Sequence, residues 1–102
     1  MKEKDLLKLI SDYLIAKKYL FYRQNSGAFV NKQGSFYKFA SISGLPDLVV
    51  ILPPNGQYVA VELKAGKNKL SNNQIFFGEK LVEAGGKYIV ARSLEDLIRE
   101  LN

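Results

Sequence analysis

Two short apolar runs, separated by a turn-forming segment, dominate the hydrophobic pattern of the chain. Residues 48–52 are all aliphatic, and residues 58–64 are apolar up to a closing Glu-Leu-Lys triplet. Both runs have the length and the β-branched content of buried strands. The segment Pro53-Pro54-Asn55-Gly56 between them has turn chemistry, so the sequence predicts an antiparallel hairpin.

Helical periodicity and capping signals predict helices on both sides of this hairpin. The first spans residues 4–17; a second spans residues 71–84, from a capping box to a pair of glycines; a third begins at residue 93 and ends near residue 101. The second helix should turn Gln74, Phe77, Gly78 and Leu81 toward the sheet. The apolar stripe of the first helix comprises Leu6, Leu7, Ile10, Tyr13 and Leu14.

The remaining segments complete a mixed α/β pattern. Residues 19–24 and 87–92 have strand composition, residues 25–35 are expected to form a polar loop, and residues 36–39 can add a short strand before Gly44. The order helix, three strands, helix, strand, helix predicts an α/β fold with a central mixed sheet flanked by helices. We expect a single domain over residues 1–102, because the chain is short and has no repeats or linkers.

The predicted hairpin brings three charged residues to one end of the sheet. Asp47 precedes the first strand, and Glu62 and Lys64 share one face at the end of the second, because side chains two apart in a strand point the same way. Taken singly, Asp47 after Pro46 is typical of a turn, and Glu62 with Lys64 is typical of a solvated charge pair. Together, two carboxylates and an ammonium can hold a hard divalent cation and act on a water molecule.

Composition narrows the possible chemistry. The 102 residues include no cysteine and no histidine, which excludes disulfides, Cys/His zinc sites and catalysis by a Ser-His or Cys-His pair. A metal ion would therefore need oxygen ligands, which points to Mg²⁺, with Mn²⁺ as a substitute. No apolar run approaches the ~20 residues of a membrane span and the start shows no signal-peptide pattern, so we expect a cytoplasmic protein without membrane contact.

The net charge of +5 makes polyanions such as DNA the first partners to consider. Polar and basic residues in segments beside the charged cluster are candidate phosphate contacts, although each could instead be a solvated surface residue. The N-terminus of the second helix adds free N–H groups that favour a phosphate. These nucleic-acid-binding candidates are Arg23, Asn25, Lys38, Lys67, Lys69 and Ser71.

The charged cluster and its surroundings resemble a known signature. The motifs Gly44-x-Pro46-Asp47 and Glu62-x-Lys64, followed in order by Gly66, Ser71 and Gln74, are similar to the VRR-NUC domain, which belongs to the PD-(D/E)XK nuclease superfamily. The resemblance covers nearly the whole chain and points to the minimal stand-alone members of phages and bacteria. It implies a restriction-endonuclease-like αβββαβ core, and it makes Gln74 an active-site residue.

The resemblance also implies a further acidic ligand from the first helix. Helical periodicity favours Glu3, which leads the apolar stripe, whereas alignment with the opening motif of the family favours Asp5. Both residues remain candidates.

These observations predict a magnesium-dependent DNA endonuclease. Asp47, Glu62 and the backbone carbonyl of Leu63 would ligate the metal, Lys64 would position the attacking water and stabilise the transition state, and Gln74 would orient the water or a phosphate oxygen. We expect a homodimer that resolves branched DNA such as Holliday junctions, in the cytoplasm of a bacterium or a phage-infected host. The alternatives are a catalytically silent nucleic-acid-binding module, and a nuclease that acts on other DNA structures or in restriction.

Overall fold

The computed structural model describes residues 1–24, 28–30, 36–38 and 44–102, the two short middle segments as backbone only. The helices and strands before residue 25 and after residue 44 follow one another in the order that the sequence predicts. The elements are α1 (Glu3–Ala16), β1 (Leu20–Arg23), β2 (Ala28–Val30), β3 (Phe36–Lys38), β4 (Leu48–Leu52), β5 (Gln57–Leu63), α2 (Asn72–Glu83), β6 (Lys87–Ala91) and α3 (Leu94–Leu101).

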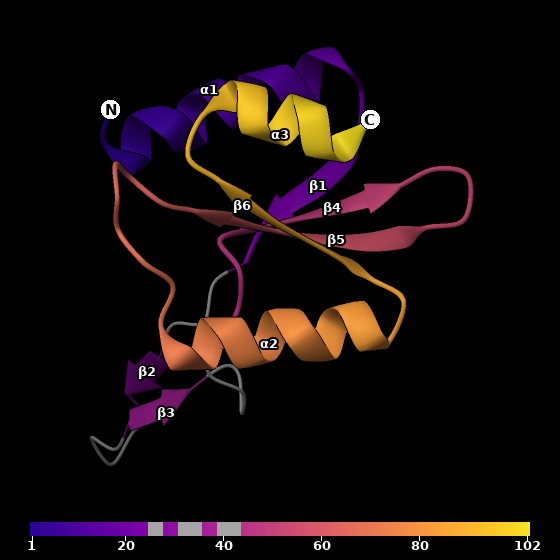
Figure 1. Cartoon of the computed structure of the whole chain (residues 1–102). Helices are drawn as coiled ribbons and strands as arrows, with labels where there is room; N and C mark the ends of the chain where they lie inside the picture. Colours follow the sequence, from indigo (N-terminus) through magenta and orange to yellow (C-terminus); the bar gives the residue numbers. More distant parts are fainter. Residues whose placement is uncertain (25–27, 31–35, 39–43) are drawn as a thin grey trace.

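A four-stranded mixed sheet of order β1-β4-β5-β6 forms the centre of the molecule. Strands β1, β4 and β5 pair antiparallel, and β6 runs parallel to β5. Helices α1 and α3 lie on one side of this sheet and α2 lies on the other (Figure 1). The prediction of an α/β fold with a central mixed sheet flanked by helices is confirmed.

The segment after β1 differs from the prediction. The sequence pattern predicts a polar loop over residues 25–35, yet β2 lies within them and pairs antiparallel with β3 as a separate two-stranded sheet. A three-residue strand is too short to show the alternation by which strands are recognised, and its pairing depends on a partner further along the chain. The short strand anticipated near residues 36–39 is present as β3.

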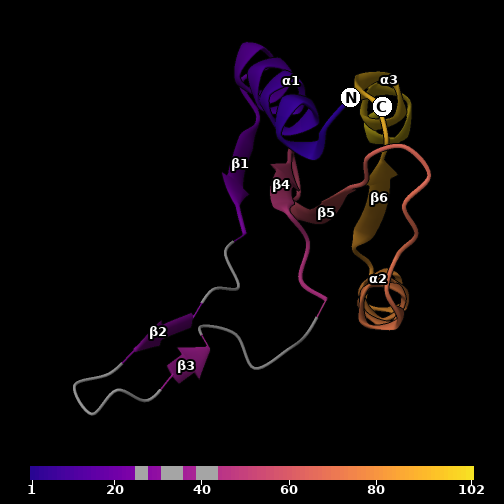
Figure 2. The same ribbon diagram turned by 90° about the vertical axis from the view of Figure 1, so that its left-hand side faces the viewer.

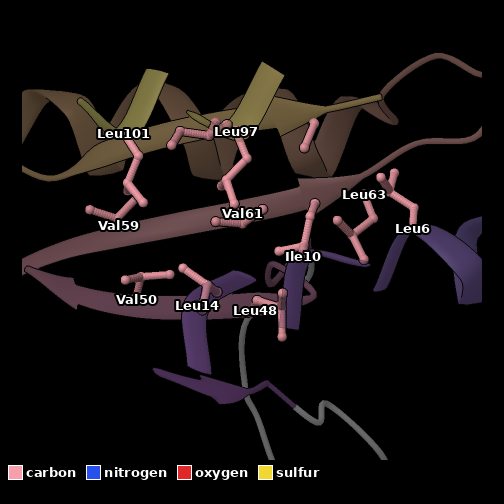
Figure 3. Close-up of a cluster of buried hydrophobic side chains, with 12 residues drawn as sticks. Leu6, Ile10, Leu14, Leu48, Val50, Val59, Val61, Leu63, Leu97 and Leu101 are labelled. Atoms are coloured by element: carbon pink, nitrogen blue, oxygen red, sulfur yellow. The ribbon is translucent and has the colours of Figure 1, made fainter. Parts of the chain in front are cut away.

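The core lies between the sheet and the α1/α3 layer (Figures 2 and 3). Side chains of β5 alternate, so that Val59, Val61 and Leu63 enter this core while Glu62 points to the opposite, α2 side. Burial of one face of β5 therefore determines where the Glu62 carboxylate lies. The core side chains contributed by the two helices are Leu6, Ile10, Leu14, Leu97 and Leu101.

The predicted helix boundaries are close to those observed. Ser71 caps α2 through a capping box, and the helix ends before Gly85, whose φ of +98° suits a residue without a side chain. Ser93 caps α3. Among the described residues, no helix combines the length and apolar character needed to cross a membrane.

Candidate active site

The turn that leads into β4 packs against the first turn of α2. Gly44 has a φ of +81°, and a Cβ atom at this position would lie 2.4 Å from the carbonyl oxygen of Asn73 and 2.9 Å from the backbone nitrogen of Gln74. Such distances are far below van der Waals contact, so only glycine fits here. The Gly-x-Pro-Asp motif thus brings the α2 N-terminus next to the turn that carries Asp47.

Asp47 is held between two strands. Its backbone carbonyl accepts a hydrogen bond from the N–H of Gln24, just after β1 (2.9 Å). Its side-chain Oδ2 accepts a hydrogen bond from the N–H of Leu63 in β5 (2.8 Å). This contact confirms the expected adjacency of Asp47 and the Glu62–Lys64 end of β5, and it orients the carboxylate through a backbone donor.

Glu62 is a buried acid with one free oxygen. The residue is 4% exposed, and its Oε1 accepts a hydrogen bond from the side-chain amide of Gln74 (2.7 Å). Its Oε2 is buried and has no partner. Burial, then the negative charge of Asp47 and a hydrogen bond that the protonated acid can make with it, raise the pKa of Glu62 to about 8, while the charge of Lys64 acts in the opposite direction.

Gln74 joins this acid to the start of α2. Its Oε1 accepts from the backbone N–H of Ser71 (2.8 Å), and its own backbone N–H donates to the Ser71 hydroxyl (3.2 Å). The opposite end of the same amide donates to Glu62. Gln74 therefore serves the capping box and the acidic cluster together, as its place on the sheet-facing stripe of α2 predicts.

Lys64 comes directly after β5, which ends at Leu63, and two residues after Glu62. Its backbone N–H donates to the carbonyl of Ala91, which extends the β5–β6 pairing by one residue (3.1 Å). The side chain is half-buried, and its charge lowers the pKa of Glu62. The structure therefore brings together Asp47, Glu62, Lys64 and Gln74, the four residues predicted to be catalytic.

A cavity of about 260 Å³ opens beside Asp47 on the side of α1. Glu3 lines this cavity, and its charge also contributes to the raised pKa of Glu62. Asp5 is exposed and is not part of the cavity wall. Of the two acidic candidates in α1, the structure places Glu3 beside the site. The cavity is lined by Glu3, Lys4, Leu7, Arg23, Asp47 and Leu63.

The family model of the VRR-NUC domain matches residues 32–95, which is well over half of the chain. The matched range includes Asp47, Glu62, Lys64 and Gln74. The chain belongs to the VRR-NUC domain family. A solved structure described as "VRR_NUC domain" is similar over its full length: it shares 25% sequence identity at a TM-score of 0.70, and the match covers 98% of this chain and 97% of that one. No curated protein sequence matches. The chain is therefore a nuclease-type module.

The basic residues of this VRR-NUC domain are placed at different distances from the acids. Arg23 lines the cavity with Asp47, whereas Lys67 and Lys69 are exposed in the loop between β5 and α2. Ser71 uses its hydroxyl as a helix cap. Asn25 and the side chain of Lys38 lie outside the described residues.

Two basic residues were missed by the sequence analysis. Lys4 lines the cavity next to Glu3, which periodicity on α1 could have indicated. Arg92 follows β6, and its guanidinium donates to the carbonyl of Gly66, so that it braces the Lys67–Lys69 loop (2.9 Å). This contact joins residues 26 positions apart, and no local pattern indicates it.

Tyr88 of β6 was also missed. Its hydroxyl is buried and has no hydrogen-bond partner. Burial, and then the charges of Glu62 and Asp47, raise the pKa of this hydroxyl. Aromatic residues in strands are usually core residues, so no sequence pattern separates Tyr88 from the others.

The VRR-NUC site fits a hard divalent cation. The buried Oε2 of Glu62 accepts no hydrogen bond, the two carboxylates of Glu62 and Asp47 are neighbours, and both supply oxygen donors of the type that Mg²⁺ prefers. Over the described ranges, no three acidic, cysteine or histidine side chains converge into a complete cage. Mg²⁺ rarely uses such cages: it is commonly bound through one or two carboxylates, with waters and substrate phosphates completing its shell.

Proposed function

We propose that this VRR-NUC domain is a magnesium-dependent endonuclease that hydrolyses phosphodiester bonds in DNA. The observation that carries the proposal is the buried, unpartnered Oε2 of Glu62 beside a second carboxylate. Two neighbouring acids with one oxygen left free are unfavourable in a protein that only needs to be stable. The same arrangement is favourable when a cation is bound between them.

Asp47, Glu62 and the carbonyl of Leu63 would hold Mg²⁺, with Mn²⁺ as a substitute and with Glu3, which lines the cavity beside Asp47, as a candidate further acid. When bound, the cation neutralises charge on the scissile phosphate and lowers the pKa of the attacking water. The hydrogen bond from the Leu63 N–H to Asp47 keeps this carboxylate oriented toward the end of β5. Hydrogen bonds of this kind fix the geometry of the groups that ligate a metal.

Lys64 and Gln74 would act beside the carboxylates. The Lys64 ammonium supplies positive charge where the phosphate gains negative charge in the transition state, and such electrostatic stabilisation makes the greatest contribution to catalysis in many enzymes. Gln74 holds Glu62 through one amide hydrogen and retains a second amide hydrogen for a water or a phosphate oxygen. Their roles are electrostatic and positional.

Substrate contacts would come from the basic rim. Arg23 at the cavity and Lys67 and Lys69 on the β5–α2 loop supply charges that can bind the DNA backbone without reading sequence. A small domain that grips phosphates in this way is suited to recognising DNA shape.

We further propose that the working form is a cytoplasmic homodimer that resolves four-way DNA junctions. Each chain carries one candidate site, whereas resolution of a junction requires two nicks related by approximate two-fold symmetry. A two-fold symmetric dimer places two sites in this relation, and it is the commonest form of oligomer. Light scattering at micromolar concentration should give about twice the chain mass of 11.5 kDa. A monomer with and without DNA would refute the dimer.

The nuclease proposal is tested with labelled DNA and purified protein. We expect cutting in Mg²⁺ or Mn²⁺, none in EDTA, and faster cutting of a four-way junction than of linear duplex. Asp47→Ala should lower the rate by on the order of a hundredfold, the scale of a lost metal-site contact. Asp12→Ala is the matched control, because Asp12 is exposed on α1 and paired with Lys8. Equal rates for Asp47→Ala and Asp12→Ala would show that the site is wrong.

A further inference from the structure

Two buried side-chain polar atoms lack a hydrogen-bond partner in the described part of the chain: Oε2 of Glu62 and the hydroxyl of Tyr88. Buried polar groups are almost always paired, so each exception needs an explanation. A cation bound as proposed above would account for the Glu62 oxygen. It leaves the Tyr88 hydroxyl unexplained.

The sheet register places these two residues on the same face. Tyr88 of β6 lies opposite Ala60 of β5, and Glu62 lies opposite Val90. Paired residues point to the same side of a sheet, so Tyr88 and Glu62 are diagonal neighbours on the α2 side. Neighbouring strands lie about 4.8 Å apart and rise about 3.3 Å per residue, so such residues are about 8 Å apart at the backbone, a separation that aromatic and other long side chains can bridge.

Helix α2 fixes the ring of Tyr88 beneath it. A Cβ atom at Gly78 would lie 2.9 Å from ring carbon Cδ2 of Tyr88, so the ring occupies space that only a glycine leaves open. The ring of Phe77 packs against it at 6.3 Å between centroids. One turn earlier on the same helix, Gln74 holds Oε1 of Glu62. The hydroxyl is therefore confined to the space under α2 that also contains the Glu62 carboxylate.

This hydroxyl has a hydrogen to donate. A tyrosine O–H can donate one hydrogen bond, and in the described part of the chain it meets no acceptor. A phenylalanine would fill the same apolar space under Gly78 without burying an unpaired group. The hydroxyl is consequently better explained by a partner that it gains in the functional state.

We propose that Tyr88 is a positioning residue for the metal-binding carboxylate, its hydroxyl donating a hydrogen bond to Oε2 of Glu62 when that carboxylate holds the cation. The proposal rests on the proposed function. With Gln74 on Oε1 and Tyr88 on Oε2, the plane of the carboxylate is fixed from two sides. The last torsion of a glutamate side chain is broad, so a rotation can bring Oε2 to the hydroxyl.

The test is Tyr88→Phe, which removes the hydroxyl and keeps the ring. The matched control is Tyr58→Phe, because Tyr58 lies near the other end of β5, opposite Ile51. Mn²⁺ binding is measured without DNA, from the electron paramagnetic resonance signal of the free ion, and the melting temperature is measured in EDTA. For Tyr88→Phe we expect a dissociation constant about ten- to hundredfold higher and an unchanged or higher melting temperature in EDTA. For Tyr58→Phe we expect the Mn²⁺ affinity of the wild type.

Cleavage supplies a second readout. At limiting Mg²⁺ the rate of Tyr88→Phe should fall well below that of the wild type, and saturating Mg²⁺ should recover most of it, because the carboxylates and Lys64 are intact. A purely structural role would not produce this dependence on metal concentration.

Each other outcome counts against the inference. A Mn²⁺ dissociation constant of Tyr88→Phe within twofold of the wild-type value overturns it while leaving the nuclease proposal standing. Weaker binding together with a melting temperature in EDTA lowered by more than about 5 °C marks Tyr88 as a packing residue and also overturns it. A wild-type protein that does not bind Mn²⁺ overturns both proposals.

Discussion

Replacing Glu62 by glutamine should stabilise the metal-free protein, and the gain should depend on pH. The folded-state pKa of Glu62 is raised from 4.5 to about 8, so the fold favours the protonated acid. Stability from this group is fully present below pH 4.5 and is lost as the pH rises through about 8. Glutamine resembles the protonated acid: its oxygen can still accept from Gln74, and its amide can donate toward Asp47.

The size of the gain follows from the two pKa values. In the unfolded chain the Glu62 carboxyl has a pKa of 4.5, so pH 7 lies 7 − 4.5 = 2.5 units above it, while in the folded protein the same acid is still largely protonated. At about 1.4 kcal/mol per unit, this corresponds to about 3 kcal/mol. Local hydration on ionisation relieves part of this cost, and we expect a gain of about 1–3 kcal/mol at pH 7. In a chain of this length that equals about 4–20 °C in melting temperature.

The assay is thermal unfolding followed by circular dichroism in EDTA, from pH 4.5 to pH 8.5. The difference in melting temperature between Glu62→Gln and the wild type should be near zero at pH 4.5 and largest above pH 8. Glu83→Gln is the control, because Glu83 is exposed and paired only with Lys80, so its effect should be small throughout. Mg²⁺ should raise the melting temperature of the wild type and not that of Glu62→Gln. A lower melting temperature for Glu62→Gln at pH 8, or a difference that does not change with pH, would refute the reasoning.

Two further predictions concern the turn and the rim. Gly44→Ala should lower the free energy of unfolding, measured in urea, by about 2–4 kcal/mol, because its Cβ would overlap the α2 backbone. Gly66→Ala is the control: this glycine also has a positive φ but has open space around it, so the loss should be only about 1 kcal/mol. Equal losses in the two variants would contradict the contact between the Gly44 turn and α2. Lys67→Ala and Lys69→Ala should each flatten the slope of log K for DNA against log salt by about one unit. Lys80→Ala, on the exposed side of α2, is the control and should leave the slope unchanged. Unchanged slopes for both loop variants would show that Lys67 and Lys69 are solvated surface residues that do not contact DNA.

The central hairpin and its acids were predictable because local rules determine them. Two apolar runs around a proline-rich turn leave one favourable pairing, and side-chain alternation then places Glu62 and Lys64 on the face opposite the core. The same holds for Gln74, whose spacing from Ser71 is a capping box and whose place on the helix faces the sheet. In each case the decisive neighbour is a few residues away or directly across a hairpin.

The features that were missed or left open depend on contacts between distant segments. Glu3 and Asp5 both lie in the first turn of α1. The way in which this helix packs on the sheet decides between them, and it places Glu3 at the cavity beside Asp47. Strand β2 exists through its pairing with β3. The brace between Arg92 and Gly66 joins a strand end to a loop. The pairing of β2 with β3 and the Arg92 contact carry no periodic signal in the sequence.

Helix α2 is the scaffold of the candidate site, because three residues between its first turn and its middle each contact a different part of it. The backbone of Asn73 packs against Gly44, in the turn that leads to Asp47. Gln74 donates a hydrogen bond to the carboxylate of Glu62. Gly78, which has no side chain, leaves space for the ring of Tyr88. Gln74 and Gly78 are one turn apart and share the sheet-facing stripe. A shift of α2 along its axis would therefore disturb both acids and the tyrosine together. The capping box therefore bears on the candidate site: by fixing where α2 begins, Ser71 and Gln74 also fix the register of every contact that the helix makes with it.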